Sequence, residues 1–221
     1  MIILPKRSGF DAQMQRVDQF LFGPGRRMRR VTNAQLDEVS HQTLIAWANL
    51  RGRYVLPTEE LIEWLRARIA GRSVLEVGAG FGDLGHLLGI RMTDSAMQQR
   101  PEMLAMYARM GQVAINPPPD VERLEAVEAV EKYKPQVVIA GFLTQAYQPG
   151  DEQSPKVGSS VFGTDEKRII DQVEEYIHIG AWAVHRDKRA RDIAYEEIAQ
   201  PWIRTRAIDP NRNVIWSWRD H

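Results

Sequence analysis

The sequence contains no cysteine among its 221 residues. This absence excludes disulfide bonds, thiolate metal sites and a cysteine nucleophile, and it is compatible with a reducing compartment. No apolar run approaches the length of a membrane span, and the opening residues 2–4 are too short for a signal peptide. Lys plus Arg equals Asp plus Glu at 29 each, so no net field favours nucleic acid or an anionic membrane. We therefore expect a soluble, cytoplasmic protein that does not bind membranes.

Paired histidines, carboxylate clusters and Ser-His arrangements at ligand or triad spacing are also lacking, so neither a metal site nor a catalytic base is indicated. His178 and His185 stand near a predicted strand end, where structural histidines are the more common case. A chain of this length can bury one sizeable core and a small accessory segment. We expect an N-terminal helical extension over residues 1–52 and one α/β domain over residues 53–221.

The most informative segment is a glycine-rich stretch at residues 73–85. Val74-Leu75-Glu76-Val77 predicts a short buried strand, and Gly78, Gly80 and Gly82 follow it before a predicted helix. Glycine permits positive φ angles and close approach of the backbone to a ligand, as a strand-to-helix nucleotide loop requires. The segment predicts a site for a cofactor that contains a nucleoside.

Two cofactors compete for this loop. Residues 80–85 match the dinucleotide pattern G-x-G-x-x-G. The strand runs directly into Gly78, however, and this register places Asp83 where a pyrophosphate would need bare amides. Glu76 at the strand end favours a cofactor with a positively charged amino group over one with two phosphates.

Residues 76–82, Glu-Val-Gly-Ala-Gly-Phe-Gly, resemble the first motif, E/D-x-G-x-G-x-G, of the class I S-adenosylmethionine-dependent methyltransferases. In that family the loop wraps the methionine part of the cofactor, and an acid after the second strand holds the ribose hydroxyls. Asp94, after the predicted strand 90–94, has the matching position, with a helix N-cap or turn as its alternative role. The resemblance implies these cofactor-binding candidates: Glu76, Gly78, Ala79, Gly80, Phe81, Gly82, Asp94, Asn116, Gly141 and Phe142. Tyr54 and Thr58 are weaker candidates, because structural roles suit them better.

Apolar periodicity extends the pattern along the chain. The predicted helices are 32 or 33–50, 58–69, 101–110, 120–134, 165–174 and 186–197. The predicted strands are 74–77, 90–94, 112–115, 136–142, 176–179 and a hairpin of 201–206 with 214–218. This alternation predicts an α/β fold: a doubly wound, mostly parallel seven-stranded sheet with a C-terminal antiparallel hairpin. Such a hairpin resembles the last two strands of a methyltransferase sheet.

Three segments bear on the acceptor. Asn116-Pro117-Pro118-Pro119 is similar to a motif of amino-methyltransferases that act on DNA bases, but Pro119 offers no ring to stack on a base. A rigid turn that places Asn116 or Asp120 near the adenine of the cofactor is favoured. Residues 144–164 are a candidate acceptor-binding lid or a surface loop. The basic run 26–30 could bind a phosphate, although a solvated or partner-facing run is the more common case.

The resulting hypothesis is an S-adenosylmethionine-dependent methyltransferase with an unidentified acceptor. A small molecule is favoured as the acceptor, while nucleic acid and protein stay open, as does the oligomeric state. One alternative is a catalytically inactive S-adenosylmethionine-binding protein that regulates or assembles others. A nicotinamide-dependent oxidoreductase is the other.

Overall fold

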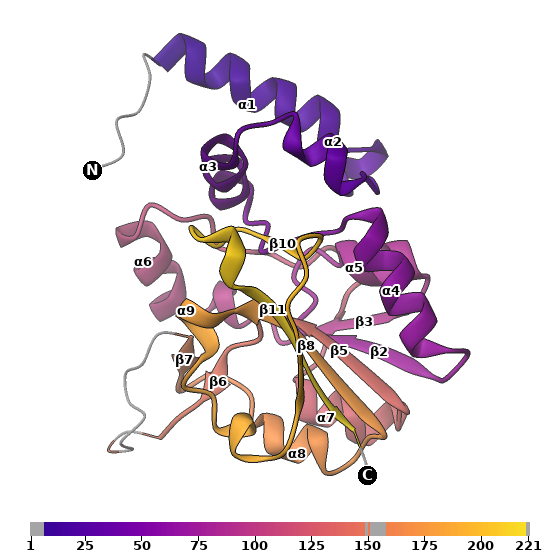
Figure 1. Ribbon diagram of the computed structural model, residues 1–221. Coiled ribbons are helices and arrows are strands. Elements are labelled where there is room, and N and C mark those ends of the chain that lie inside the picture. The colour runs from indigo at the N-terminus through magenta and orange to yellow at the C-terminus, as the bar shows by residue number, and fades with distance from the viewer. Residues whose placement is uncertain (1–6, 149, 151–157, 220–221) are drawn as a thin grey trace.

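A seven-stranded sheet forms the centre of the computed structural model, which describes residues 7–148, 150 and 158–219 (Figure 1). The strand order is β4-β3-β2-β5-β8-β11-β9. Neighbours from β4 to β8 run parallel, whereas β11 runs antiparallel to both β8 and β9. The bounds are β2 Val74–Val77, β3 Arg91–Asp94, β4 Glu122–Arg123, β5 Val137–Gly141, β8 Glu175–Ala181, β9 Glu196–Ile198 and β11 Asn213–Arg219. The predicted doubly wound sheet is confirmed.

Helices cover both faces of this sheet. On one face α4 (Glu59–Ile69) and α5 (Asp83–Leu88) share an apolar cluster with Val137 and Ile139 of β5. On the other, α7 (Ala126–Tyr133) and α8 (Glu166–Ile170) share a cluster with Val138 and Ala140. Alternate residues of β5 thus enter opposite layers, as the period of a strand requires. The remaining helices of the domain are α6 (Pro101–Arg109) and α9 (Trp182–His185).

The N-terminal helices form a separate layer at one end of the molecule (Figure 1). They are α1 (Arg7–Leu21), α2 (Asn33–Asp37) and α3 (His41–Arg51), and they have an apolar cluster of their own around Trp47. The single helix predicted from residue 32 or 33 to 50 is wrong: Ser40 interrupts it, because its side chain accepts the Thr43 N–H at 3.3 Å as the N-cap of α3. The helical extension is present, and its boundary at residue 52 stays a prediction.

Two short pairings join distant parts of the chain. β1 (Val55–Leu56) pairs antiparallel with β10 (Arg204–Thr205), which places the segment before α4 against the C-terminal region. β6 (Gln145–Ala146) pairs with β7 (Ser159–Ser160) in the loop after β5. No helix in the described ranges is long and apolar enough to cross a membrane.

The third strand lies elsewhere than predicted. Residues 112–115 are a loop, and β4 at Glu122–Arg123 takes the edge position beside β3. Side-chain amides satisfy the backbone of Ile115 instead of a neighbouring strand: Gln98 accepts its N–H and Gln99 donates to its carbonyl, both at 2.8 Å. The helix predicted from Asp120 begins only at Ala126, because the Glu125 carboxylate caps it by accepting the Val127 N–H.

The C-terminal prediction is wrong in two segments. The helix predicted over 186–197 is absent: α9 ends before it, and a 3-10 turn at Arg189–Asp192 and β9 occupy its place. β9 takes the place beside β11 that residues 201–206 were predicted to fill, and β10 pairs with β1 instead. The helix predicted over 165–174 has Asp165 at its N-cap position, without a side-chain cap hydrogen bond, and extends only from Glu166 to Ile170. The helix predicted over 58–69 is confirmed, with Thr58 accepting the Leu61 N–H at 3.1 Å.

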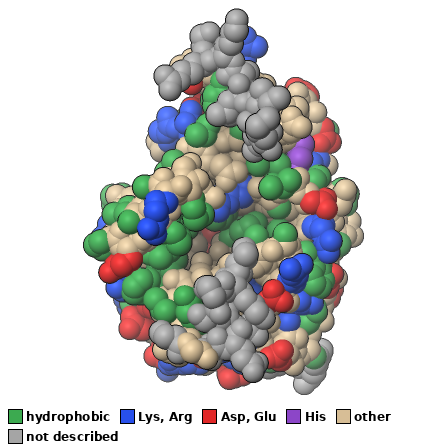
Figure 2. Space-filling view, turned by 90° about the vertical axis from the view of Figure 1, so that its left-hand side faces the viewer, with side chains coloured by type: hydrophobic (Ala, Val, Ile, Leu, Met, Phe, Trp, Pro, Cys, Tyr) green, Lys and Arg blue, Asp and Glu red, His purple; other side chains and the backbone are tan. Residues whose placement is uncertain are grey.

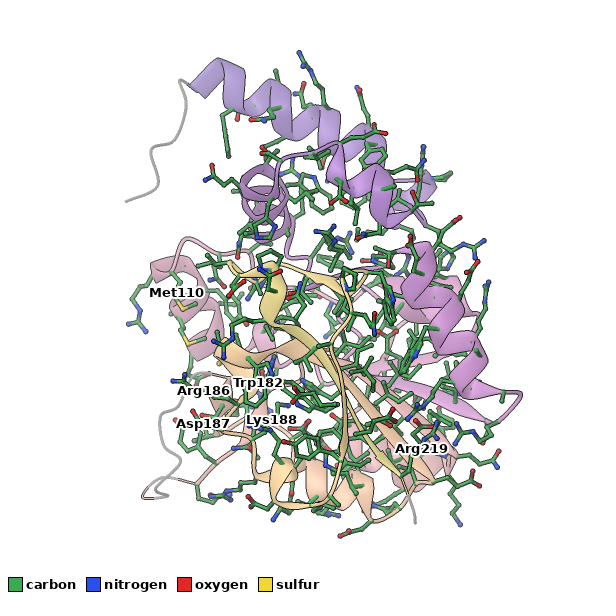
Figure 3. The ribbon with its side chains drawn as sticks, in the orientation of Figure 1. Met110, Trp182, Arg186, Asp187, Lys188 and Arg219 are labelled. Carbon is green, nitrogen blue, oxygen red and sulfur yellow. The ribbon has the colours of Figure 1, made fainter. Side chains whose placement is uncertain are left out.

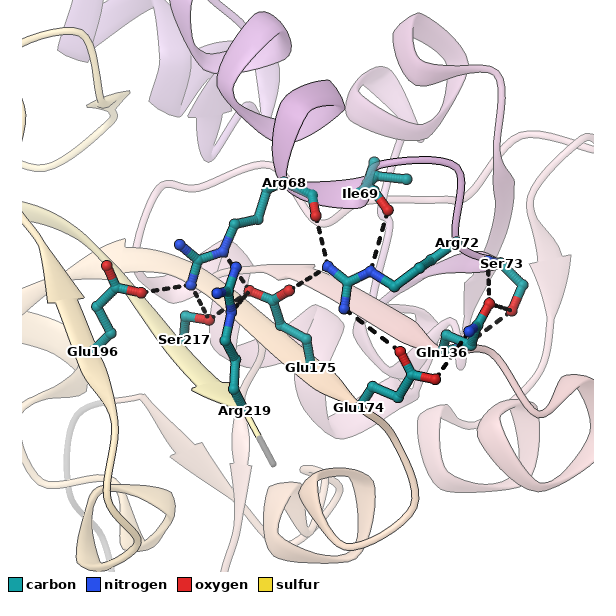
Figure 4. A network of polar contacts seen from close by, with 10 residues as sticks. All are labelled: Arg68, Ile69, Arg72, Ser73, Gln136, Glu174, Glu175, Glu196, Ser217 and Arg219. Atoms are coloured by element: carbon teal, nitrogen blue, oxygen red, sulfur yellow. Dashed lines mark hydrogen bonds and ion pairs between the residues drawn. The ribbon is translucent and has the colours of Figure 1, made fainter. Parts of the chain in front are cut away.

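A network of arginines around Glu175 closes the amino end of β8 (Figure 4). Arg68, Arg72 and Arg219 all pair with the Glu175 carboxylate. Burial raises the pKa of Glu175, but the hydrogen bonds from these guanidinium groups outweigh it and bring the pKa to about 2. The network ties α4 to the sheet at the end opposite the glycine-rich loop.

Candidate functional site

The glycine-rich loop joins β2 to α5 with little free space around it. Gly78, Gly80 and Gly82 have φ angles of +58°, +56° and +72°, which favour glycine. A Cβ atom on Gly78 would lie 2.5 Å from Leu143 Cδ1, and one on Gly80 would lie 3.1 Å from Ile115 Cδ1. The loop therefore needs glycine both for its backbone angles and for close packing.

Glu76 lies beneath this loop and does not line the cavity above it. Its side chain is 3% exposed, and Oε2 accepts the N–H of Gly85 in α5 at 2.7 Å. Burial raises the pKa of Glu76 to about 8. At neutral pH the group is therefore mostly protonated, and its observed contact fastens α5 to β2.

Asp94 lies at the carboxyl end of β3 and lines the cavity. Oδ2 accepts the Gly80 N–H at 2.8 Å and Oδ1 accepts the Ala96 N–H at 2.7 Å. A carboxylate has about four acceptor positions, so each oxygen of Asp94 can take a further donor. This geometry combines the turn role with an open acceptor at the cavity wall.

The cavity has a volume of about 80 Å³ and lies beyond the carboxyl ends of the parallel strands. It sits where the strand order reverses between β2 and β5, the position at which open α/β sheets bind ligands. The face seen in Figure 2 is hollowed below the N-terminal helices. The lining comprises Tyr54, Gly78, Gly80, Asp94, Ser95, Met97, Gln98, Tyr107, Ile115, Gly141, Phe142, Leu143, Thr144, Phe162, Gly163 and Thr164.

Aromatic side chains enclose one side of the cavity. Phe142 follows β5 with φ +55°, a left-handed angle that is costly for a residue with a side chain and that clusters at ligand sites. Its ring centroid lies 5.6 Å from that of Tyr54 and 4.9 Å from that of His185. The hydroxyl groups of Tyr54 and Tyr107 are 3.1 Å apart, and both residues line the cavity.

A buried ionic cluster supports the loop after β5. Lys188 Nζ donates to the Leu143 carbonyl at 2.7 Å and to Glu166 Oε2 at 2.5 Å, and Tyr176 donates to Glu166 Oε1 at 2.6 Å. Burial raises the pKa of Glu166, but the charges and hydrogen bonds of Lys188 and His178 together outweigh it and bring the pKa to about 2. Burial lowers the pKa of His178 to about 4, so this histidine is neutral at physiological pH. Lys188, labelled in Figure 3, follows α9 in the chain.

The N-terminal segment holds the outer side of the glycine-rich loop. Arg27 donates to the Phe81 carbonyl and to the Asp120 carboxylate. Arg53 pairs with Asp83, and its guanidinium carbon lies 3.9 Å from the centroid of the Phe81 ring. Arg27, in the basic run 26–30, therefore contacts the glycine-rich loop. Local sequence patterns gave no signal for these pairings, because their partners are distant in the chain.

The ten predicted cofactor residues fall into two groups. Gly78, Gly80, Asp94, Gly141 and Phe142 line the cavity, while Glu76, Ala79, Phe81, Gly82 and Asn116 do not. Ala79 donates its N–H to the Thr93 carbonyl at 3.0 Å, and exposed Asn116 accepts from Arg123 at 3.2 Å. The assignment of these ten residues to a cofactor stays a prediction.

The weaker candidates and the predicted lid divide in the same way. Tyr54 lines the cavity, whereas buried Thr58 caps α4. Of the predicted lid 144–164, Thr144 and residues 162–164 line the cavity, and positions 149 and 151–157 lie outside the described residues. No group of His, Cys, Asp and Glu suited to a metal occurs in the described ranges.

A larger open groove, of about 710 Å³, lies at the opposite end of the sheet beside Trp64. Its guanidinium groups, from Arg68, Arg72 and Arg219, are the ones paired with Glu175. These donors are already used in the network of Figure 4. The smaller cavity at the glycine-rich loop is therefore the better candidate site.

The sequence matches no family model and no curated protein. Among solved structures, a Thermoplasma acidophilum protein is similar at 20% identity and a TM-score of 0.36, covering 86% of this chain and 95% of that chain. The delta-N METTL16 MTase domain is similar at 12% identity and a TM-score of 0.40, covering 99% and 100%. A Pyrococcus abyssi tRNA (uracil-54, C5)-methyltransferase in complex with S-adenosyl-L-homocysteine is similar at 11% identity and a TM-score of 0.36. That match covers 72% of this chain and 36% of that chain.

Most of the named neighbours are methyltransferases. The strand order itself defines the fold, because β11 is inserted antiparallel between β8 and β9. A dinucleotide-binding sheet of order 3-2-1-4-5-6 has no such insertion. The fold that the resemblance at residues 76–82 implies, a mostly parallel seven-stranded sheet with an antiparallel C-terminal strand, is confirmed.

Proposed function

We propose that the chain is an S-adenosylmethionine-dependent methyltransferase that binds its cofactor in the cavity between the glycine-rich loop and the loop after β5. The observation that carries this proposal is the strand order with β11 inserted, together with the cavity at its switch point. Bound there, the cofactor supplies an activated methyl group. The acceptor we favour is a small molecule.

The residues around the cavity fit the chemistry of the cofactor. Asp94 has acceptor positions left for ribose hydroxyls, and Gly78 and Gly80 bring the backbone close to the ligand. Gly141 and Phe142 form the wall across from the loop. The remaining predicted residues, Glu76, Ala79, Phe81, Gly82 and Asn116, would act by supporting the loop or its surroundings.

Binding requires the cavity to widen. A volume of about 80 Å³ is well below the roughly 300–1,000 Å³ of small-molecule sites. The Tyr54 and Tyr107 hydroxyl groups hold two lining residues together, and we infer that they separate when the ligand enters. The protein's part in methyl transfer is then to align the acceptor with the methyl group and exclude water.

The test is calorimetric titration with S-adenosylmethionine, S-adenosylhomocysteine and NAD, comparing the wild type with Asp94→Asn. Loss of the charged acceptor should weaken both adenosyl ligands about 10- to 100-fold. Asp192→Asn, at an exposed position outside the cavity, is the matched control. Failure of the folded wild type to bind either adenosyl ligand would contradict the proposal, and binding of NAD instead would support an oxidoreductase.

A second candidate is a protein that binds the cofactor without transferring its methyl group. It is favoured by the cavity lining, in which the titratable side chains are two tyrosines and Asp94. Screening acceptors with a methyl-labelled cofactor separates the two. Labelled product supports transfer, and binding without product across a broad screen supports the inactive protein.

A further inference from the structure

Arg206 is held directly against the cavity wall. It follows β10, and its backbone N–H donates to the Tyr54 carbonyl at 3.0 Å. Its guanidinium carbon lies 3.5 Å from the centroid of the Tyr54 ring, a stacked cation–π contact. Tyr54 also contacts Phe142 and Tyr107, so its ring lies among the side chains that line the cavity. The position of Arg206 is thus fixed by both backbone and ring contacts.

The guanidinium group of Arg206 has donor capacity that the protein leaves unused. Nη1 is buried and, among the described residues, has no hydrogen-bond partner. Nη2 reaches Gln112 Oε1 only at 3.5 Å, the outer limit of a hydrogen bond. Arginine has five N–H donors and no acceptor, and a buried donor without a partner is costly. Such a group calls for an explanation in a ligand or partner.

Neighbouring arginines are compensated, whereas Arg206 is not. Arg27 pairs with Asp120 and Arg53 pairs with Asp83. Within residues 7–148, 150 and 158–219, no carboxylate forms an ion pair with Arg206. A positive charge without a counter-ion in this part of the chain therefore stacks on Tyr54, a residue of the cavity lining, while Arg206 itself is not one of the lining residues.

Arg206 and Asp94 act on the same tyrosine. Both charges influence the Tyr107 hydroxyl, whose pKa burial raises, and that hydroxyl contacts Tyr54. A donor-only group thus contacts Tyr54, and an acceptor-only group lines the cavity together with both tyrosines. A ligand with hydroxyl groups at one end and a carboxylate at the other matches this arrangement. The adenosyl cofactor of the proposed function has both.

We propose that Arg206 binds a carboxylate of the ligand in this cavity, in the first instance the carboxylate of the methionyl part of S-adenosylmethionine. This inference rests on the proposed function for the identity of the ligand. The same guanidinium chemistry suits an acidic group on the acceptor, because arginine pairs with carboxylates in a bidentate manner. The two sources are distinguished by ligands with and without the methionyl carboxylate.

The test compares S-adenosylhomocysteine with 5′-methylthioadenosine, which has the same nucleoside but no carboxylate. Calorimetry on the full chain measures both ligands with the wild type, Arg206→Gln, Arg206→Lys and the control Arg109→Gln, an exposed position on α6. Arg206→Gln should weaken S-adenosylhomocysteine about 10- to 100-fold and change 5′-methylthioadenosine less than about twofold. Arg206→Lys should be intermediate. Circular dichroism checks that each variant is folded.

A further titration uses inorganic phosphate as an oxyanion probe. If Arg206→Gln binds both nucleosides with unchanged affinity but no longer binds phosphate, Arg206 is an oxyanion site that recognises the acceptor. If Arg206→Gln weakens the binding of both nucleosides equally, Arg206 only supports Tyr54 and the proposal is overturned. Unchanged affinity for all three ligands would also overturn it. If the wild type binds neither nucleoside, the proposed function fails, and the phosphate titration alone decides whether Arg206 is an oxyanion site.

Discussion

Gly82 and Gly89 provide an internal comparison of crowding at the glycine-rich loop. They flank the two ends of α5 with nearly equal φ angles, +72° and +71°. Alanine in this left-handed region costs roughly 1–2 kcal/mol at either position. The surroundings differ: a Cβ on Gly82 would lie 2.7 Å from Met92 Sδ and 2.9 Å from Val121 Cγ2, whereas nothing lies within 4 Å of one on Gly89.

Gly89→Ala should therefore lose only the backbone contribution, roughly 1–2 kcal/mol of unfolding free energy. Gly82→Ala should lose a further 1–3 kcal/mol or so, because overpacking displaces Met92 and Val121. Urea unfolding followed by tryptophan fluorescence measures both, and thermal unfolding should separate the variants by about 2–4 °C per kcal/mol. Equal losses, or a larger loss at Gly89, would refute the view that close packing demands glycine at position 82.

Three further perturbations test the buried contacts. Since the pKa of Glu76 is raised from 4.5 to about 8, the folded chain retains a proton that the unfolded chain releases, and stability should fall as pH rises through this window. Glu76→Gln should remove up to about 1.4 kcal/mol per pH unit of that slope in urea titrations, and a stability difference from wild type that is constant with pH would contradict it. Lys188→Met leaves the Glu166 carboxylate buried without its cation and should cost about 3–5 kcal/mol in thermal unfolding. Adding Glu166→Gln to Lys188→Met should recover part of this loss. If the two substitutions instead destabilise additively, the ion pair between Lys188 and Glu166 is refuted. Arg27→Gln frees the Phe81 carbonyl and should cost about 1–3 kcal/mol and speed amide exchange over residues 78–83, and unchanged exchange there would refute the contact.

The central strands were predictable because their burial determines their composition. β5 and β8 are covered on both faces, so their residues form nearly continuous apolar runs. The glycine-rich loop was equally predictable, because three positive φ angles within five residues require glycine at Gly78, Gly80 and Gly82. Thr58 as an N-cap followed from its side-chain chemistry.

The edge strands were not predictable for the opposite reason. β4 is the pair Glu122–Arg123, and β9 begins with Glu196 and Glu197. Charged residues are typical of sheet edges, where they discourage pairing with other chains, but they carry no apolar period. Residues 112–115 gave a stronger strand signal, yet side chains of Gln98 and Gln99 satisfy that backbone. Tertiary contacts decided between the two segments.

The same distinction applies to the candidate site. The loop residues Gly78, Gly80 and Asp94 follow from a local motif, and they do line the cavity. The residues that hold the loop could not be predicted from a local motif, because Arg27 and Phe81 are 54 positions apart and Arg53 and Asp83 are 30 apart. No local window contains both partners of such a pair. Arg206 likewise contacts Tyr54 of the cavity lining only because β10 pairs with β1.

The pairing of Asp83 changes which cofactor argument is strongest. Its position seemed to oppose a pyrophosphate by repulsion, but Arg53 compensates its charge and the Met28 N–H donates to it at 3.0 Å. Electrostatic repulsion by Asp83 therefore contributes less to the choice between cofactors than the sequence suggested. Asp94 lines the cavity and Arg206 stacks on Tyr54 of its lining, and among the described residues neither forms an ion pair. The two charges require opposite chemistry from a ligand. A nucleoside with a terminal carboxylate satisfies both, which is why the pair of ligands with and without that carboxylate is the sharper test of the site.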